Sequence, residues 1–439
     1  MASNFVTNIL AFVIVLGFLI FIHEAGHFLV AKLFRVRVLV FSLGFGKRIA
    51  GFEKGGTEYR IAIVPLGGYV RMAGDNPEEA SGDDPGEFLS KPKWQRFLIL
   101  VAGPVMNLIV AVSFLAALFM TPREVPREFP PSIGTVLAGK PAAKAGLQPG
   151  DRILSVSGDP ISTWDDLRLA ISIRPETRLE VVFLRAGVQH TTSLTPERQL
   201  TQYGSAGIAG ITPYLRPEVG KVIAGSAAAR AGLQRGDIIV RAGGKAISQW
   251  SPDFDRAIDG ADKHPVPMTV NRNGKLIDLT LPRMVGDADQ YPGFTLPTVL
   301  KQSGFVDAVQ ESVAENLKMM RLVFFTLGRL FRAEGSVQDF SGPISIARIS
   351  GDMLRSGWQA LVFLMASISL QLGILNLLPV PVLDGGQIFI LGVEAIARRD
   401  LSIRVKERIQ QVGFALLAAL MLVVLFNDVI QNVTLMRKG

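Results

Sequence analysis

The chain contains four long stretches of mostly apolar residues, each long enough to cross a membrane as a helix. They cover residues 5–32, 97–120, 358–390 and 411–430. About 17 or more apolar residues in helical form span the roughly 30 Å of hydrocarbon in a bilayer. The pattern therefore predicts a polytopic α-helical membrane protein with four transmembrane helices.

The composition agrees with a chain that is partly embedded in lipid and partly exposed to water. Its 439 residues are 49% hydrophobic and 19% charged, and the mean hydropathy is +0.33. The absence of cysteine excludes disulfides, thiolate zinc sites and cysteine nucleophiles. A net charge of +8 would suit nucleic acid, but in a membrane chain Lys and Arg more often mark cytoplasmic loops. We therefore predict the lipid bilayer, and no nucleic acid, as a partner.

Basic residues are concentrated in two of the connecting loops. Eleven lie between residues 32 and 96, and five more lie between residues 398 and 408. The positive-inside rule places both loops in the cytoplasm, so both termini and the long loop of residues 121–356 lie outside. The first span has no small-residue cleavage site behind it, which predicts a retained anchor.

The long outer loop contains an internal repeat. Residues 136–164 align without gaps onto residues 222–250, with sixteen identities in 29 positions. Each copy has a short Ala-rich helix, a Gly-Asp turn, an apolar strand and a Gly turn. This pattern resembles the bacterial, circularly permuted PDZ domain, which binds an extended peptide at a sheet edge. We predict two α+β PDZ-like domains at residues 126–200 and 203–284; the alternative is that the pair is only a spacer or lid.

The rest of the outer loop is a predicted amphipathic helical connector, residues 300–356. Within it, residues 305–331 place apolar side chains on one helical face, while interleaved Lys and Arg make the segment too polar to span. We expect this helix to lie on the outer membrane face or against the repeats. The membrane core then has two halves, residues 1–120 and residues 357–439.

The first apolar stretch carries the motif His23-Glu24-Ala25-Gly26-His27. Residues four apart share one face of a helix, so both imidazoles can bind one Zn²⁺, with Glu24 beside them. Ionisable groups within a membrane are functional candidates by default, because burying them in lipid is costly. A histidine pair buried without metal is the less favoured alternative.

A catalytic zinc site needs a third protein ligand and an open position for water. The chain has no cysteine, and His190 and His264 fall in the outer repeats, so we expect a carboxylate. Asp384 is the best candidate, because Pro379 and Pro381 break the helix before it and free backbone groups that only a protein cavity satisfies. The first and third stretches run in the same direction with both motifs toward the inner end, so the two halves can meet near the cytoplasmic face.

Two motifs together resemble the paired signatures of the site-2 intramembrane metalloproteases. They are His-Glu-x-x-His in the first span and Asn-x-x-Pro-x-Pro-x-Leu-Asp-Gly at residues 376–385. The tandem PDZ-like insert is similar to that of the RseP (regulator of sigma-E protease) group. The resemblance covers nearly the whole chain, and it includes residues 41–46, 65–70, 103–107 and 341–347.

The resemblance implies a Zn²⁺ ion held by His23, His27 and Asp384, with Glu24 as the general base. It agrees with the chemistry inferred from the residues themselves. Asn376, at the start of the second motif, is the candidate hydrogen-bond donor to the substrate backbone. The alternative for Asn376 is that it satisfies carbonyl groups freed in the broken helix.

A β-hairpin is predicted in the first cytoplasmic loop. Residues 41–46 and 59–72 alternate or run apolar with β-branched residues, and the turn-rich residues 54–56 lie between them. They resemble the family's membrane-reentrant hairpin, whose edge would accept an unwound substrate as an added strand. We predict substrate contacts at four consecutive positions of this segment: Leu43, Gly44, Phe45 and Gly46. The alternative is a hairpin that only packs.

The sequence thus predicts an intramembrane zinc endopeptidase that cleaves transmembrane segments of single-span membrane proteins. By resemblance, the substrates are an anti-sigma factor already cleaved outside the membrane, and also remnant signal peptides. The same resemblance implies a multi-pass protein of the bacterial inner membrane, with periplasmic PDZ-like domains and the active site toward the cytoplasm. The rival functions are an inactive membrane scaffold and a metal transporter.

Overall fold

The chain divides into two compact units. The first comprises Met1–Thr121 and Ser303–Gly439, and the second comprises Pro122–Gln302. The computed structural model describes residues 2–76, 84–127, 129–201, 204–258, 264–283, 293–331 and 342–438.

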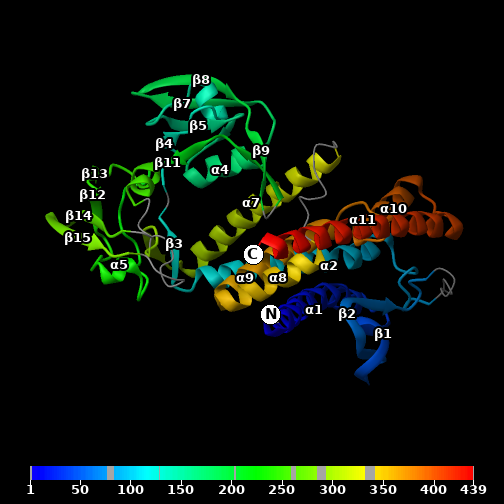
Figure 1. Ribbon diagram of the computed structural model, residues 1–439. Helices are drawn as coiled ribbons and strands as arrows, with labels where there is room; N and C mark the ends of the chain where they lie inside the picture. Colours follow the sequence, from blue (N-terminus) through cyan, green and yellow to red (C-terminus); the bar gives the residue numbers. More distant parts are fainter. Residues whose placement is uncertain are drawn as a thin grey trace. The chain divides into compact units, whose positions relative to one another are not determined.

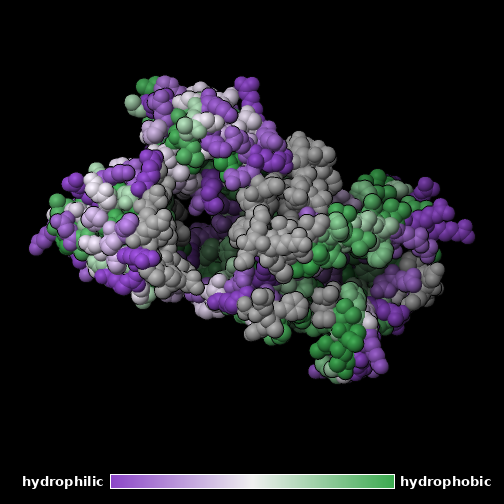
Figure 2. All heavy atoms as spheres, viewed as in Figure 1, coloured by the Kyte–Doolittle hydropathy of each residue, from purple (hydrophilic) through white to green (hydrophobic). Residues whose placement is uncertain are grey.

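In the described part of the first unit, four helices are long and apolar enough to cross a membrane (Figure 1). They are α1 (Ala2–Leu33), α2 (Lys93–Phe119), α9 (Trp358–Asn376) and α11 (Ile403–Lys438). Each contains one of the four apolar stretches predicted to span, except that the second stretch ends one residue past α2 and the third continues past the end of α9. Figure 2 shows hydrophobic residues gathered over α11 and over the hairpin.

The third apolar stretch is broken where the two prolines predicted it. Helix α9 ends at Asn376, and α10 begins at Asp384 and continues to Ala397. The chain between them turns back so closely that a Cβ atom on Gly386 would lie 2.1 Å from the carbonyl oxygen of Val380. Two prolines that cannot continue a helix and a glycine that permits this return together place Asp384 at a helix start.

The predicted connector consists of two helices that belong to the membrane unit, α7 (Phe305–Phe331) and α8 (Pro343–Ser356). Helix α7 packs along α2 and α9, where Met319, Met320 and Val323 lie against the cluster around Leu370. Helix α8 packs on α1 and α9. The helix–helix interface with α2 and α9 buries part of the apolar face of α7, and the expectation that α7 lies on the outer membrane face or against the repeats stays a prediction.

The predicted hairpin is present and longer than expected. Strands β1 (Val38–Lys54) and β2 (Thr57–Met72) are joined at Gly55 and Gly56, whose φ angles of +59° and +71° suit a tight two-residue turn. Both strands bend, so the hairpin folds back on itself and forms four paired segments, of which the two central ones run parallel and the two outer pairs run antiparallel. Their order is Gly68–Met72, Val40–Leu43, Glu58–Ile61 and Ala50–Lys54.

This folding corrects the predicted position of the free edge. Leu43 pairs with Gly68 on one side and with Ile61 on the other, so the segment that contains it has no edge to offer. Gly44 and Gly46 lie in the bend at positive φ, and Phe45 stacks on Tyr69. The edge beside α1 is the segment 68–72, which pairs with β1 on one side only; on this segment the Val70 N–H donates to Glu24 and the Met72 N–H donates to Asp75.

The second unit contains two similar four-stranded antiparallel sheets (Figure 1). The first copy has the order β6-β5-β7-β8: β5 (Arg152–Val156), β6 (Asp159–Pro160), β7 (Leu179–Arg185) and β8 (Val188–Leu194). The second copy has the order β13-β12-β14-β15: β12 (Ile238–Ala242), β13 (Lys245–Ala246), β14 (Val266–Arg272) and β15 (Lys275–Leu281). Helices α3 (Pro141–Lys144) and α4 (Trp164–Ser172) pack in the first copy, and α5 (Ala227–Arg230), η1 (Trp250–Phe254) and α6 (Asp255–Ala257) in the second.

An ion pair repeats in both copies. Asp151 accepts hydrogen bonds from Arg185, and Asp237 accepts them from Arg272, in each case with a shortest N···O distance of 2.7 Å. Both aspartates belong to the Gly-Asp turns and are almost fully buried. The repeat found in the sequence is therefore a structural repeat.

The copies extend further along the chain than the predicted boundaries. In the first copy, β4 (Ile133–Val136) pairs with β11 (Ile211–Pro213), so the copy does not end at residue 200. The boundary at residues 200–203 falls inside a hairpin of β9 (Glu197–Thr201) and β10 (Gly204–Ile208). The second copy includes Phe294, which is buried in its core beyond residue 284. The sequence pattern did not predict these additional segments, because a segment that joins a domain from far along the chain leaves no local signal.

The two ends of the second unit lie side by side. Strand β3 (Arg123–Pro126) pairs antiparallel with β16 (Thr298–Lys301), in a register that joins Pro126 to Thr298. The whole insert therefore leaves and rejoins the membrane unit through a two-stranded ribbon.

Candidate metal and catalytic site

The structure brings the three predicted ligands together. His23 and His27 lie one turn apart on α1, both are buried, and their Nε2 atoms are 3.3 Å apart. Asp384, from the start of α10, places Oδ2 3.1 Å from His23 Nε2 and 3.4 Å from His27 Nε2. One atom from each side chain therefore faces a common point.

These separations suit zinc. A tetrahedral Zn²⁺ ion with ligands at about 2.0–2.1 Å holds its ligand atoms roughly 3.3 Å from one another. The three separations found here, 3.1, 3.3 and 3.4 Å, match the edges of such a tetrahedron. Two neutral imidazoles and one carboxylate also form a donor set that zinc prefers, and the fourth position is left for water.

Two glycines let α1 and α2 approach closely enough for the rings to fit. A Cβ atom on Gly103 would lie 2.3 Å from His27 Nε2, and one on Gly26 would lie 2.4 Å from the carbonyl oxygen of Ala102. Any larger residue at either position would displace a helix or a ring. The glycine within the His-Glu-x-x-His motif and the glycine of the second span thus serve the same contact.

Glu24 lies beside the ligands without joining them. It is half-buried, and the backbone N–H of Val70 on β2 donates a hydrogen bond to its carboxylate. Glu24, the three ligands, Tyr69 and Val70 line one cavity of about 340 Å³. A carboxylate held at the edge of a metal site and open to a cavity is placed to take a proton from a metal-bound water.

Asn376 lies at the C-terminal end of α9, and its side-chain nitrogen is 3.5 Å from His23 Nε2. The structure therefore brings this predicted residue to the site. Leu43, Gly44, Phe45 and Gly46 are not among the residues that line the cavity; the residues of the hairpin that line it are Tyr69, Val70 and Met72.

Helix α2 contributes two contacts that the sequence did not predict. His27 Nδ1 lies 2.8 Å from the carbonyl oxygen of Ile99, and His23 Nδ1 lies 3.2 Å from the Asn107 amide. Asn107 lies in the segment 103–107 that resembles the site-2 protease family, but the sequence alone assigns it no role. It could have been found as a lone amide within an apolar span, where polar groups are rare and usually functional.

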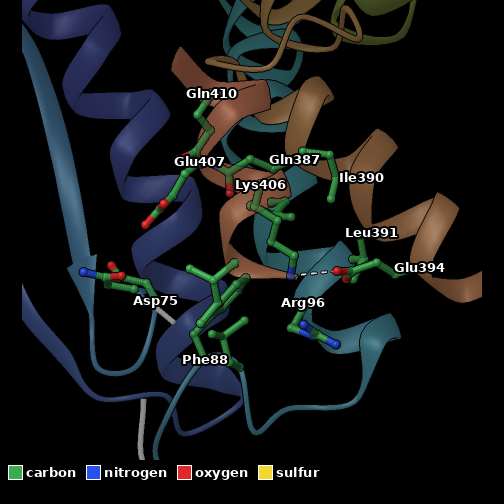
Figure 3. Close-up of a pocket in the computed structure, with 14 residues that line it drawn as sticks. Asp75, Phe88, Arg96, Gln387, Ile390, Leu391, Glu394, Lys406, Glu407 and Gln410 are labelled. Carbon is green, nitrogen blue, oxygen red and sulfur yellow. Dashed lines mark ion pairs between the residues drawn. The ribbon is translucent and has the colours of Figure 1, made fainter. Parts of the chain in front are cut away.

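A second cavity of about 150 Å³ adjoins the first (Figure 3). Asp75, Phe88 and Gln387 line both cavities, and Glu407 lines the second. At its far side, Lys406 of α11 forms an ion pair of 2.6 Å with buried Glu394 of α10. Polar side chains thus continue from the metal site into the second cavity.

A family model for peptidase family M50 matches residues 11–420. The chain belongs to peptidase family M50. Members of this family use zinc, so the protein is a membrane zinc metalloprotease of the site-2 type.

Several full-length relatives are similar to the chain. Regulator of sigma-E protease RseP of Salmonella typhimurium (strain 14028s / SGSC 2262) is 34% identical over 445 residues, 96% of this chain and 98% of that protein. The protein of the same name from Escherichia coli (strain K12) is 32% identical and covers 97% of this chain and 99% of its own length. Among solved structures, the PDZ domain of an SdrC-like protein from Listeria monocytogenes matches 21% of this chain and 93% of that chain, with 17% identity and a TM-score of 0.17.

Proposed function

We propose that this M50 protease resides in the bacterial inner membrane and cleaves transmembrane segments of single-span proteins. The carrying observation is a complete set of zinc donors with an adjacent carboxylate, built from helices of membrane-spanning length. Relatives named as regulators of sigma-E protease support an anti-sigma factor, already cleaved on its outer side, as the substrate. Remnant signal peptides are a second substrate class within the same proposal.

The residues of the site have separate tasks. His23, His27 and Asp384 would hold a zinc ion, which would supply a Lewis acid beside the scissile carbonyl. Glu24 would take a proton from the attacking water and pass it to the leaving nitrogen. Asn376 would donate a hydrogen bond to the substrate backbone.

The topology follows from the charge distribution. The basic loops lie in the cytoplasm, so the site faces that side and the two PDZ-like domains lie in the periplasm. The cavity lined by Gln387 and Glu407 then leads toward the cytoplasmic loop between α10 and α11.

The free edge of the hairpin receives the unwound substrate. A helix in lipid must exchange its internal hydrogen bonds for others before it can be cut. The segment 68–72 borders the catalytic cavity, and the Val70 N–H already points away from β1 toward Glu24. An extended substrate beside this edge lies next to both Glu24 and the metal.

If the substrate adds to the hairpin as a strand, every second backbone N–H of the substrate should donate a hydrogen bond to the hairpin. Replacing single amides near the cut by esters, one position at a time and sparing the scissile bond, removes one donor without changing the enzyme. Cleavage should fall about 5- to 10-fold at alternate positions, because each lost hydrogen bond contributes about 1 kcal/mol. Rates are measured with purified enzyme, and an ester far from the cut is the control. Uniform effects, or none, contradict strand addition.

Zinc content and cleavage measured together test the ligand assignment. His23→Ala, His27→Ala and Asp384→Ala should each lose bound zinc and activity, because three ligands are the minimum for a catalytic site. Asp307→Ala, which changes an aspartate on α7, should keep both. Near-normal zinc in Asp384→Ala removes it from the ligand set. Zinc bound without any cleavage of a transmembrane substrate favours the scaffold, and zinc moved across a vesicle membrane favours the transporter.

A further inference from the structure

Asn107 lies against one metal-site histidine and has no part in the chemistry given so far. It is fully buried within α2, and its side-chain amide is 3.2 Å from His23 Nδ1. Within the described residues, its Oδ1 atom has no hydrogen-bond partner. A buried amide oxygen without a partner is unfavourable, so the amide requires an explanation.

The orientation of the His23 ring determines whether Asn107 must donate or accept a hydrogen bond. His23 Nε2 faces Asp384 Oδ2 at 3.1 Å and His27 Nε2 at 3.3 Å, so Nε2 is the atom that binds the metal. A neutral imidazole that gives the lone pair of one nitrogen carries its proton on the other. Nδ1 is therefore a donor in the metal-bound protein, and the group that faces it must accept.

The Asn107 amide can meet this demand by turning. With Nδ2 toward His23 Nδ1, the amide donates to Nδ1 and the imidazole proton must lie on Nε2. A protonated Nε2 can donate to Asp384 but has no lone pair to bind a metal. With the amide turned by half a rotation, Oδ1 accepts from Nδ1–H and gains the partner it lacks.

The other histidine has a fixed counterpart. His27 Nδ1 lies 2.8 Å from the carbonyl oxygen of Ile99, a backbone acceptor on the same helix α2. Asn107 is itself held, because Ser369 of α9 donates a hydrogen bond of 2.8 Å to its backbone carbonyl. Metal-binding histidines commonly donate their second N–H to such an acceptor, which orients the ring.

We propose that Asn107 is the positioning residue for His23: its side-chain oxygen accepts a hydrogen bond from the Nδ1–H of His23 when zinc is bound. The inference rests on the proposed assignment of His23 as a ligand. It deepens that assignment by naming the group that sets the tautomer of the ring.

The zinc dissociation constant of the purified full chain, measured by competition with a chelator, tests this role. Asn107→Leu keeps the size and removes the acceptor, and it should weaken zinc binding about 10- to 100-fold. Asn107→Ala, which adds no bulk, should show the same loss. Asn107→Asp supplies a permanent acceptor and should bind zinc within a few-fold of the wild type.

Two controls separate the possible failures. Asn316→Leu removes another buried amide, on α7, and should leave zinc affinity unchanged. His23→Ala tests the ligand assignment: retained zinc there overturns the assignment itself. If His23→Ala loses zinc while Asn107→Leu and Asn107→Ala bind it normally, only the positioning role is wrong. An equal loss in Asn107→Asp and Asn107→Leu shows that Asn107 acts by packing, and it overturns the role as well.

Discussion

Glu24→Gln should reduce cleavage of a transmembrane substrate by about 10²- to 10⁴-fold, the usual contribution of a positioned general base. The amide keeps the size of the side chain but cannot take a proton. It should still accept the hydrogen bond from Val70, because a side-chain amide retains an acceptor oxygen. The measurement is turnover by purified protein, with bound zinc determined on the same sample.

Zinc content distinguishes proton transfer from coordination. Full zinc occupancy with lost turnover supports the role of Glu24 as a base, since the three ligands remain in place. Glu53→Gln makes the same chemical change on the exposed part of the hairpin and should leave turnover near the wild-type level. A Glu24→Gln protein that lacks zinc would make Glu24 a ligand. One that cleaves normally would require another base.

The metal site could be predicted from the sequence because each of its parts has a local signature. Four-residue spacing places His23 and His27 on one face of a helix, and the prolines before Asp384 mark where a helix must stop. Elimination of cysteine and of the outer histidines then favoured a carboxylate. The structure joins these parts at distances that suit zinc.

Asn107 and the free edge of the hairpin could not be predicted in this way. The contact between Asn107 and His23 joins residues 84 positions apart, and a single Asn in a span has no periodicity. The hairpin pattern predicted two strands but not their bend at Gly44 and Gly46, which places Leu43 between two partners. A strand whose apolar and polar residues alternate can lie in the centre of a sheet or at its edge, and only its pairing with other strands decides which.

The second large effect concerns the inserted domains. We propose that they exclude substrates whose outer domains are still bulky, so removing them should permit cleavage of full-length, untrimmed substrate. The paired register of Pro126 and Thr298 gives a precise design: a short turn of a few residues can replace residues 127–297 and close the ribbon. Cleavage of untrimmed substrate should rise from near zero to the rate for trimmed substrate.

The trimmed substrate decides between exclusion and recruitment. A recruiting domain needs a loop that binds a free carboxylate. The segment that resembles one, Gly207–Ile208, lies in β10 of the first copy, where it pairs with β9. If the domains exclude bulky substrates, the protein without them cleaves trimmed substrate as fast as the wild type does. Adding Glu24→Gln to the excised protein should abolish both cleavages, which shows that this site performs them. If excision instead stops cleavage of trimmed substrate while zinc binding and folding persist, the domains recruit the substrate. The catalytic site is then intact, so the loss of cleavage must come from a lost binding step.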